Sequence, residues 1–168
     1  MDLDLGGRRA LVCGGSDGIG RASAMELASM GAEVILLARN ADRLEAARRA
    51  LTAPRGQAHG WLDVDVADTD ALRARVAALA GESAVHILVN NTGGPPGGPA
   101  HAAVLDAFTD AFARHVLAAQ VLVQALLQGM RDARWGRIVN VVSTSVREPI
   151  AGLGVSNTVR GAVAGWAK

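Results

Sequence analysis

Apolar runs and amphipathic stretches alternate along this chain from one end to the other. Apolar runs of the length of one buried strand occupy residues 10–13, 33–39, about 57–64, 85–90 and 136–142. Helical composition fills the intervals, from residue 18 or 19, over 41–51, about 70–80, about 102–130 and from 155 onward. Strands that alternate with helices at this spacing indicate βαβ units. The sequence therefore predicts one α/β domain over residues 1–168, with a doubly wound parallel sheet and helices on both faces.

The longest predicted helix, about 102–130, carries apolar residues at helical spacing. The positions that step by four and three residues are Phe108, Phe112, His115, Ala119, Leu122 and Leu126. Residues at this spacing share one face of a helix. We therefore expect these side chains to lie together on the face that meets the sheet.

A glycine-rich turn joins the first predicted strand to the first predicted helix. Glycine permits a tight reversal and lets the backbone approach a ligand. The helix that opens at Gly18 or Ile19 offers free N–H groups and a positive dipole end, which suit a diphosphate. A turn with three glycines by accident is the alternative, but the position between a strand and a helix favours a dinucleotide-binding site of the Rossmann type. The predicted cofactor-binding positions in this turn are Gly14, Ser16, Asp17, Gly18, Ile19 and Gly20.

Polar side chains follow the ends of the other predicted strands. Ligands of a doubly wound sheet bind at the carboxyl ends of its strands, so Arg39, Asp65, Asn90 and Ser143 are expected to converge there. At the end of the second strand an acid would bind the ribose 2′-hydroxyl of NAD, whereas an arginine suits the extra phosphate of NADP. Arg39 stands at this point, with no acid before Asp42. We therefore predict NADP as the cofactor, with NAD as the alternative; an arginine that only faces water is the other interpretation.

Composition narrows the classes of function. Half of the residues are hydrophobic, 20% are charged and the formal net charge is +1, which makes no case for nucleic acid or a membrane surface as partner. The first residues lack the pattern of a signal peptide, and no apolar run has the length of a membrane span, so we expect a cytoplasmic protein with a small-molecule substrate. The single cysteine, Cys13, and the four scattered histidines form no pattern of metal ligands.

The motifs resemble those of the classical short-chain dehydrogenase/reductase family over residues 5–168. The glycine turn is similar to the family's TGxxxGIG, with Cys13 in place of the threonine. Residues 65–66 look like its adenine-contacting Asp and the next residue, residues 90–93 like its NNAG, and residues 136–140 like its lead into the catalytic serine. The resemblance implies a Rossmann-type fold, a catalytic role for Ser143, and further cofactor contacts from Asp65, Val66, Asn91 and Gly93.

The chain departs from this family at the residues of proton transfer. It contains no tyrosine, and its only lysine is Lys168. The family's Tyr-x-x-x-Lys motif falls on residues 156–160, so Ser156 stands for the tyrosine and Arg160 for the lysine. The family's catalytic asparagine falls on His115, and only Ser143 is retained. The chain thus resembles 3-oxoacyl-carrier-protein-reductase-like members with an incomplete catalytic tetrad.

These replacements change the acid–base chemistry that the site offers. A serine hydroxyl does not titrate near neutrality as a tyrosine beside a cation does. Arg160 stays charged, so it could polarise an oxyanion or bind ribose hydroxyls but could not relay a proton. His115 is the one titratable replacement, and a hydrogen-bonded core histidine is the alternative.

Three functional interpretations follow from these residues. The first is an NADP-dependent oxidoreductase that transfers hydride between the cofactor and a carbonyl or alcohol, including 3-oxoacyl-like substrates, with an atypical proton donor. The second is a non-catalytic, dinucleotide-binding homologue that acts as a sensor or partner subunit. The third is a fragment with structural meaning only.

The resemblance also bears on the C-terminal region and on assembly. Family members continue past the helix that begins near Val155 with another helix and two strands, so we expect the C-terminal part of the fold to be missing from a sequence that ends within this helix. The fifth strand would then form an exposed edge of the sheet. In the family the helices that begin near Ala102 and Val155 pack against their copies in a partner subunit, which implies a homo-oligomer here.

Overall fold

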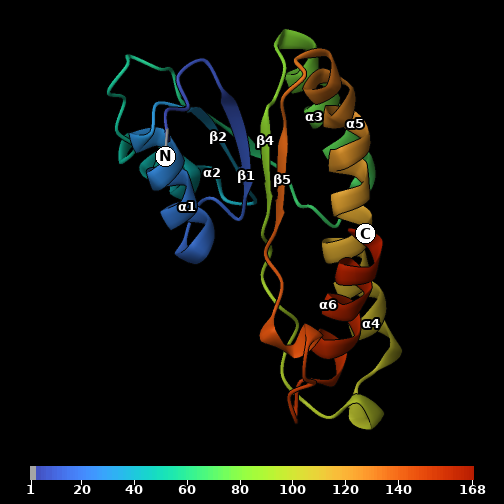
Figure 1. The fold of residues 1–168 in the computed structure, drawn as a ribbon. Coiled ribbons are helices and arrows are strands. Elements are labelled where there is room, and N and C mark those ends of the chain that lie inside the picture. Colours follow the sequence, from blue (N-terminus) through green and yellow to red (C-terminus); the bar gives the residue numbers. More distant parts are fainter. Residues whose placement is uncertain (1–2) are drawn as a thin grey trace.

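A computed structural model describes residues 3–168 of the chain, and in this range it shows one parallel sheet with helices on both faces. The strands are β1 (Arg9–Cys13), β2 (Glu33–Ala38), β3 (Gly60–Asp63), β4 (Ile87–Asn90) and β5 (Arg137–Asn140). The α-helices are α1 (Gly18–Ser29), α2 (Ala41–Arg49), α3 (Thr69–Glu82), α4 (Leu105–Phe112), α5 (Ala118–Asp132) and α6 (Gly154–Trp166). The strand order β3-β2-β1-β4-β5 (Figure 1) confirms the predicted doubly wound fold.

Two apolar layers cover the sheet because successive side chains of a strand point to opposite faces. Leu11 and Cys13 of β1 belong to the layer that packs under α3 and α5. Ala10 and Val12 belong to the opposite layer, beneath α1 and α2. All four side chains are at most 1% exposed. Burial of one leucine-sized side chain contributes about 1.5–3 kcal/mol, so these two layers hold the helices on the sheet.

The predicted long helix forms, but it begins at Leu105 instead of near residue 102 and is interrupted by a π-helical turn. A short 3₁₀ turn, η1 (Ala100–Ala102), precedes α4, and a π-helical turn, η2 (Ala113–Leu117), separates α4 from α5. A π turn carries an extra residue, so the residues before it are rotated relative to those after it. Phe112 is consequently 42% exposed, whereas His115 is 7% exposed and the three later positions of the expected face are buried. Phe108 packs with α6 in a separate apolar cluster rather than on the sheet.

This third cluster lies beyond the carboxyl ends of β4 and β5. It joins buried residues of α4, η2 and α6, namely Ala111, Val116, Val155, Val159 and Val163. In Figure 1, α4 and α6 lie side by side at the lower end of the molecule, below the strands. The cluster therefore places α6 next to the edge of the sheet where the strand-end residues are found.

The carboxyl ends of the strands are level with one another. Val12 of β1 pairs with Leu36 of β2 and with Val89 of β4, which in turn pairs with Val139 of β5. At the last pair of β4 and β5, the Asn90 side-chain amide donates to Asn140 Oδ1 at 2.8 Å. The loops that follow these strands consequently start from one edge of the sheet.

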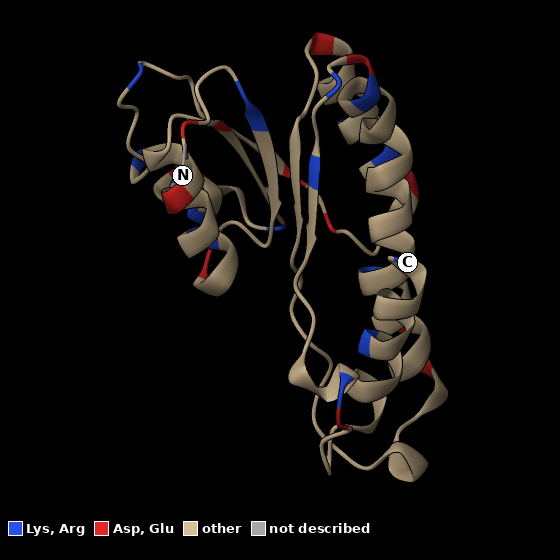
Figure 2. Cartoon of the chain, in the orientation of Figure 1, with Lys and Arg blue, Asp and Glu red and all other residues tan. Residues whose placement is uncertain are grey.

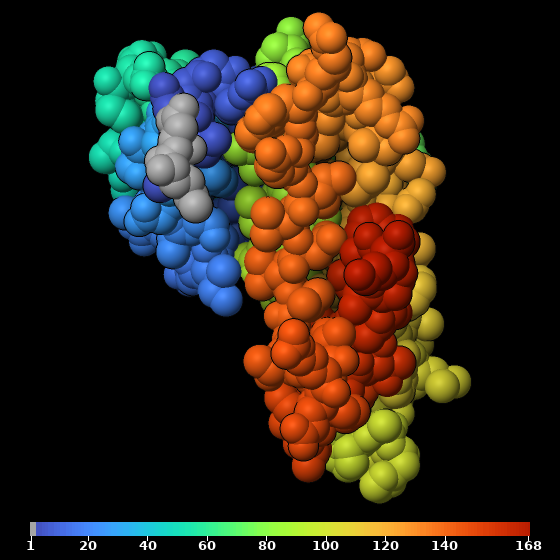
Figure 3. Space-filling model, in the orientation of Figure 1, coloured from blue at the N-terminus to red at the C-terminus, as the bar shows by residue number. Residues whose placement is uncertain are grey.

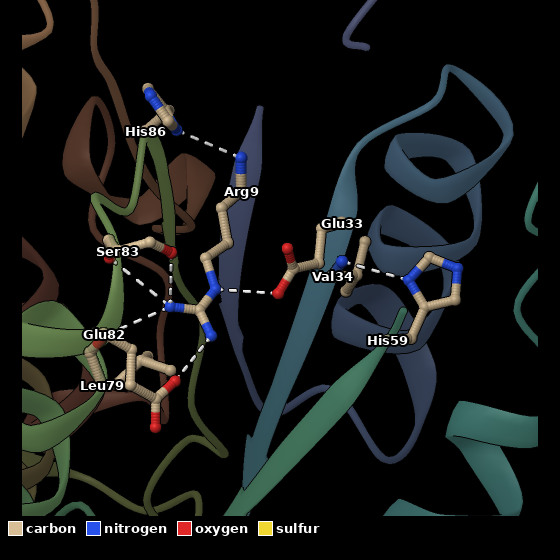
Figure 4. A network of polar contacts seen from close by, with 8 residues as sticks. All are labelled: Arg9, Glu33, Val34, His59, Leu79, Glu82, Ser83 and His86. Carbon is tan, nitrogen blue, oxygen red and sulfur yellow. Dashed lines mark hydrogen bonds and ion pairs between the residues drawn. The ribbon is translucent and has the colours of Figure 1, made fainter. Parts of the chain in front are cut away.

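The amino end of the sheet is fixed by one arginine. Arg9 Nε donates to Glu33 Oε1 at 2.8 Å, and its terminal nitrogens donate to Glu82 Oε2, Ser83 Oγ and the Leu79 carbonyl at 3.0, 3.0 and 3.1 Å. Figure 4 shows the guanidinium between β2 and the end of α3. The side chain is only 11% exposed. Its partners therefore compensate the charge that burial desolvates.

The outer strand β5 forms an edge of the sheet, as predicted. Ile138 and Val139 are 37% and 49% exposed. Figure 3 shows the segment that contains them in orange, at the front of the molecule in this view. Figure 2 shows acidic and basic residues mixed along the ribbon, with no long segment of one sign in this view. Within residues 3–168, no helix is long and apolar enough to cross a membrane.

Candidate functional site

The glycine turn between β1 and α1 packs closely against the loop that follows β4. Gly14 has φ +62°, and a β-carbon on it would lie 2.7 Å from the Asn91 carbonyl oxygen. A β-carbon on Gly20 would overlap the Gly14 carbonyl oxygen. Asp17 is the N-cap of α1, with its side chain accepting from Gly18 N at 2.8 Å. The sequence therefore needs glycine at 14 and 20 for chain packing and places the N-terminus of α1 at the turn.

A groove of about 710 Å³ opens at this turn and runs along the carboxyl ends of β2, β3 and β4. Its volume lies in the range of small-molecule and cofactor sites. Ten of the eleven predicted cofactor positions line it, namely Gly14, Ser16, Asp17, Gly18, Ile19, Arg39, Asp65, Val66, Asn91 and Gly93. The exception, Gly20, is buried beneath the turn against Gly14. The structure thus brings these separated residues to one concave surface.

Two lining arginines were not singled out from the sequence. Arg43 lies in the first turn of α2 and Arg114 in η2. Arg43 stands four residues after Arg39, and residues 39–43 pass directly from the end of a strand into a helix. This short spacing indicates that Arg43 also lies near the carboxyl ends of the strands. Arg114 had no such signal, since the π turn that orients it is not visible in the apolar pattern.

Charges in the groove are arranged as arginine–aspartate pairs. Arg114 donates to Asp65 Oδ1 at 2.8 Å, and Arg39 approaches Asp65 Oδ2 at 3.8 Å. Arg43 donates to Asp17 Oδ2 at 2.8 Å. Three guanidiniums therefore face two carboxylates, and the excess is positive. Such an excess suits an anionic ligand in a concave site.

A smaller pocket lies deeper, between β4, β5, η2 and α6. Its lining includes Asn90, Asn140, His115 and Arg160, and it shares Thr92, Val66 and Arg114 with the groove. Thr92 Oγ1 and His115 Nδ1 are 2.6 Å apart. His115 Nε2 and Asn90 Oδ1 are buried, and neither has a hydrogen-bond partner among the described residues. The pocket has a volume of about 20 Å³, so it is a small recess beside the groove with both polar and apolar side chains in its lining.

The acid–base properties of the deep pocket follow from its burial and its cations. Burial, together with the positive charges of Arg160 and Arg114, lowers the pKa of His115 to about 4, against the opposing effect of a Gly93 backbone hydrogen bond. His115 is therefore neutral at pH 7. Desolvation also lowers the pKa of Arg160, but an arginine remains charged. Burial raises the pKa of the Cys13 thiol to about 12, so this lining residue stays protonated.

The four predicted catalytic residues do not all reach this pocket. His115 and Arg160 line it, and Arg160 is held in place by donating to the Val141 carbonyl at 2.8 Å. Ser143 follows β5 and accepts from Ser145 N at 3.1 Å as the N-cap of a 3₁₀ turn, η3 (Thr144–Val146). Ser156 lies in the first turn of α6, one turn before Arg160. Neither serine is among the lining residues of the groove or of the deep pocket.

No group of three or more metal-ligating side chains is assembled within residues 3–168. The site offers guanidiniums, carboxylates, amides and hydroxyls, together with the backbone N–H groups of the glycine turn. These groups bind phosphates, ribose hydroxyls and carbonyl oxygens.

Comparison with known proteins gives this geometry a context. Residues 8–168 match the protein family described as short chain dehydrogenase. Gluconate 5-dehydrogenase of Gluconobacter oxydans (strain 621H) is 34% identical over 162 residues, which cover 96% of this chain and 63% of that protein.

Solved structures agree with the sequence relatives. L-sorbose reductase from Gluconobacter frateurii, complexed with NADPH and L-sorbose, superposes with a TM-score of 0.92 and 30% identity over 99% of this chain and 64% of that one. A 3-oxoacyl (acyl-carrier-protein) reductase from Agrobacterium tumefaciens C58 with NADP bound gives 0.90 and 25% identity, over 98% and 64% of the two chains. The chain thus spans slightly less than two thirds of the length of these proteins.

Proposed function

The chain belongs to the short-chain dehydrogenase family, and from that premise we propose that it forms the cofactor-binding part of an NADP(H)-dependent oxidoreductase acting on a carbonyl or alcohol. The observation that carries the proposal is the groove at the carboxyl ends of the strands, where the glycine turn, Arg39, Asp65 and Asn91 meet. The bound cofactor would supply or accept the hydride. This chain's residues bind and orient the cofactor and the substrate.

The preference for NADP(H) rests on the end of β2. Arg39 lines the groove there, and its guanidinium is 69% exposed and only loosely paired, at 3.8 Å from Asp65. A loosely paired guanidinium is available for a phosphate, which it binds in bidentate geometry. The relatives with NADPH or NADP bound support the same preference.

The proposed roles in the deep pocket follow from which groups can carry charge or a proton. Arg160 would stabilise negative charge that develops on the carbonyl oxygen, because it stays charged and half-buried. Ser143 and Ser156 lie outside the deep pocket, so we propose that Ser143 orients the carbonyl, and Ser156 holds it by a further hydrogen bond, only for a substrate that extends beyond this pocket. His115 is neutral at pH 7 and has a partner on Nδ1 alone, so it would act as a hydrogen-bonding group and not as an imidazolium acid. The proton that completes alcohol formation would come from water.

A carbonyl compound of small size or of 3-oxoacyl type is the substrate class that we propose. The support is the similarity to a sugar reductase and to a 3-oxoacyl reductase. A homo-oligomer is proposed as well, through the region of α4 and α6. Its support is an apolar surface on this side of the chain, where Val104 and Leu105 are 70% and 82% exposed and Leu117 is 45% exposed.

The second candidate function is a non-catalytic NAD(P)-binding homologue that senses the cofactor or serves as a partner subunit. Serine at 156 and arginine at 160 favour it, since neither side chain can titrate near neutrality. The groove is equally compatible with this function, because binding requires no proton donor.

The first experiment is a fluorescence titration of the folded chain with NADPH and with NADH. We expect micromolar binding of NADPH and at least about tenfold weaker binding of NADH, which corresponds to about 1.4 kcal/mol from the 2′-phosphate. Arg39→Ala should remove most of this difference. Circular dichroism on each sample controls for folding. Equal affinities would refute the preference for NADP(H), and binding of neither nucleotide by a folded chain would refute both candidate functions.

A second experiment separates the enzyme from the sensor. NADPH oxidation is followed with a panel of ketones and 3-oxoacyl thioesters, for the natural chain and for a Ser156→Tyr, Arg160→Lys double variant. An enzyme should turn over slowly, and the double variant should be about 10²-fold faster because a titratable donor is restored. Absence of turnover in both proteins, with NADPH binding intact, would favour the sensor.

A further inference from the structure

Arg43 and Asp17 form an ion pair across the groove. Arg43 Nη2 donates to Asp17 Oδ2 at 2.8 Å, although the two residues are 26 positions apart. Arg43 comes from the first turn of α2, and Asp17 is the N-cap of α1, so the contact connects the two helices that flank the end of β2. Both residues line the groove. The pair therefore lies where a ligand along β2 would pass.

Asp17 has two separate roles in this arrangement. Its Oδ1 accepts from Gly18 N at 2.8 Å and caps α1, while its Oδ2 binds Arg43. The capping role needs an oxygen acceptor but no charge. The contact with Arg43, in contrast, neutralises the guanidinium. A negative charge at position 17 is therefore not required for the fold of the turn.

Arg43 and Arg39 both line the groove near the carboxyl end of β2. Arg39 is the first residue after β2, Asn40 caps α2, and Arg43 follows within the first helical turn. The side chains of Arg39 and Arg43 are 69% and 61% exposed. Two accessible guanidiniums separated by one turn of chain match a doubly charged group, because each can supply charge-assisted hydrogen bonds to it.

We propose that Arg43 is a second specificity residue for the cofactor's 2′-phosphate, and that Asp17 competes with this phosphate for Arg43 and thereby limits the affinity for NADP(H). The inference rests on the proposed NADP(H)-binding function. The cofactor displaces the Asp17 carboxylate from Arg43, and the guanidinium then faces the phosphate together with Arg39.

Replacement of the Asp17 carboxylate by the 2′-phosphate at Arg43 is energetically favourable. The Asp17 and Arg43 side chains are 69% and 61% exposed, and ion pairs this exposed contribute little to stability, so the contact is easily opened. A phosphate carries more charge than a carboxylate and accepts two parallel bonds from a guanidinium. Asp42 also lies in the first turn of α2, but it is not among the residues that line the groove. Asp17 is thus the carboxylate that contacts Arg43.

The test uses NADPH and NADH as probes on three variants. Arg43→Ala should weaken NADPH about 3- to 10-fold and change NADH less than about twofold, because one charge-assisted contact to the phosphate is lost. Asp17→Asn keeps the capping oxygen and removes the charge, so NADPH should bind about 2- to 5-fold tighter with NADH unchanged. This gain should shrink at high salt.

Arg49→Ala is the matched control. Arg49 lies on the same helix, is 74% exposed and pairs with Glu45 away from the groove, so its removal should leave both affinities unchanged. Equal weakening of NADPH and NADH in Arg43→Ala, or no tightening in Asp17→Asn, would overturn the inference while leaving the proposed function intact. A folded natural chain that binds neither nucleotide would overturn both.

Discussion

Thr92 Oγ1 lies 2.6 Å from His115 Nδ1 and thereby joins the loop after β4 to the π-helical turn between α4 and α5. Thr92 lines the groove and the deep pocket, whereas His115 is buried in the deep pocket alone. The contact is therefore a direct polar connection between a cofactor-facing loop and the interior. This contact satisfies Nδ1 of the buried imidazole, whereas Nε2 has no hydrogen-bond partner among the described residues.

The first prediction concerns the pH dependence of stability. Burial and the neighbouring arginines lower the pKa of folded His115 to about 4, below the unfolded value of 6.5. The unfolded chain therefore binds the proton more tightly, so the stabilisation is present above pH 6.5 and is lost as the pH falls from 6.5 through 4. We expect a loss of about 3 kcal/mol in the free energy of unfolding between pH 7.5 and 4, measured by urea titration.

His115→Asn is the control for this prediction. The variant has no group that titrates at this position, so its stability should change less between the two pH values. His86, whose pKa is lowered by burial and by Arg8, contributes equally to both proteins. An identical pH slope in the two proteins would show that His115 is not buried as described.

The second prediction concerns Arg9 at the amino end of the sheet. Arg9→Leu leaves the Glu33 and Glu82 carboxylates and the Leu79 carbonyl without their donor. Arg9 is largely buried, but the side chains of Glu33 and Glu82 are 35% and 67% exposed and can regain water. The cost therefore comes mainly from the lost hydrogen bonds, and we expect a decrease of about 1–2 kcal/mol in the free energy of unfolding. Arg73→Ala, which removes an exposed pair with Asp70, should cost less than about 0.5 kcal/mol. Similar losses in the two variants would contradict the prediction.

The third prediction compares two glycines. Gly20→Ala would place a β-carbon against the Gly14 carbonyl oxygen, so the glycine turn must shift. We expect a lower melting temperature and loss of nucleotide binding. Gly81→Ala in α3 meets no atom within 4 Å, and alanine is favoured over glycine in a helix, so it should stabilise by about 0.5 kcal/mol. A Gly20→Ala variant with an unchanged melting temperature and unchanged nucleotide binding would contradict the close packing of residue 20 against the Gly14 carbonyl.

The fourth prediction concerns the thiol of Cys13. Burial raises its pKa to about 12, and a thiol that is not ionised is a poor nucleophile. The folded chain should therefore fail to react with a disulfide reagent such as dithiobisnitrobenzoate at pH 8, whereas the chain unfolded in guanidinium should release one equivalent per molecule, since the sequence has one cysteine. Rapid reaction of the folded chain would indicate that β1 opens readily.

The long helix marks the limit of prediction from periodicity. Spacing by three and four residues correctly put His115 and Leu122 on a buried face, because the helix packs beside the sheet from the π turn onward. It failed at Phe112, which is exposed. The reason is that a π turn changes the phase of the helix without changing the apolar pattern, and that α4 packs on α6 instead of on the sheet.

Ion pairs across the groove mark a second limit. Asp17 and Asp65 were expected to face a cofactor, and both line the groove, but their arginine partners lie 26 and 49 residues away. Pairing of exposed side chains over such separations depends on how the loops after different strands are oriented. No local pattern in the chain encodes it.

The sequence by itself determined the alternation of strands and helices, the burial of β1 and the glycine turn between β1 and α1. These features depend on apolar periodicity and on the absence of a β-carbon, which are properties of short segments. Only the tertiary structure decided that His115 pairs with Thr92, that Arg160 joins it in one pocket while Ser143 and Ser156 do not, and that Arg43 meets Asp17. These contacts arise where parallel strands end at one edge of the sheet, because that edge brings together loops that are distant along the chain.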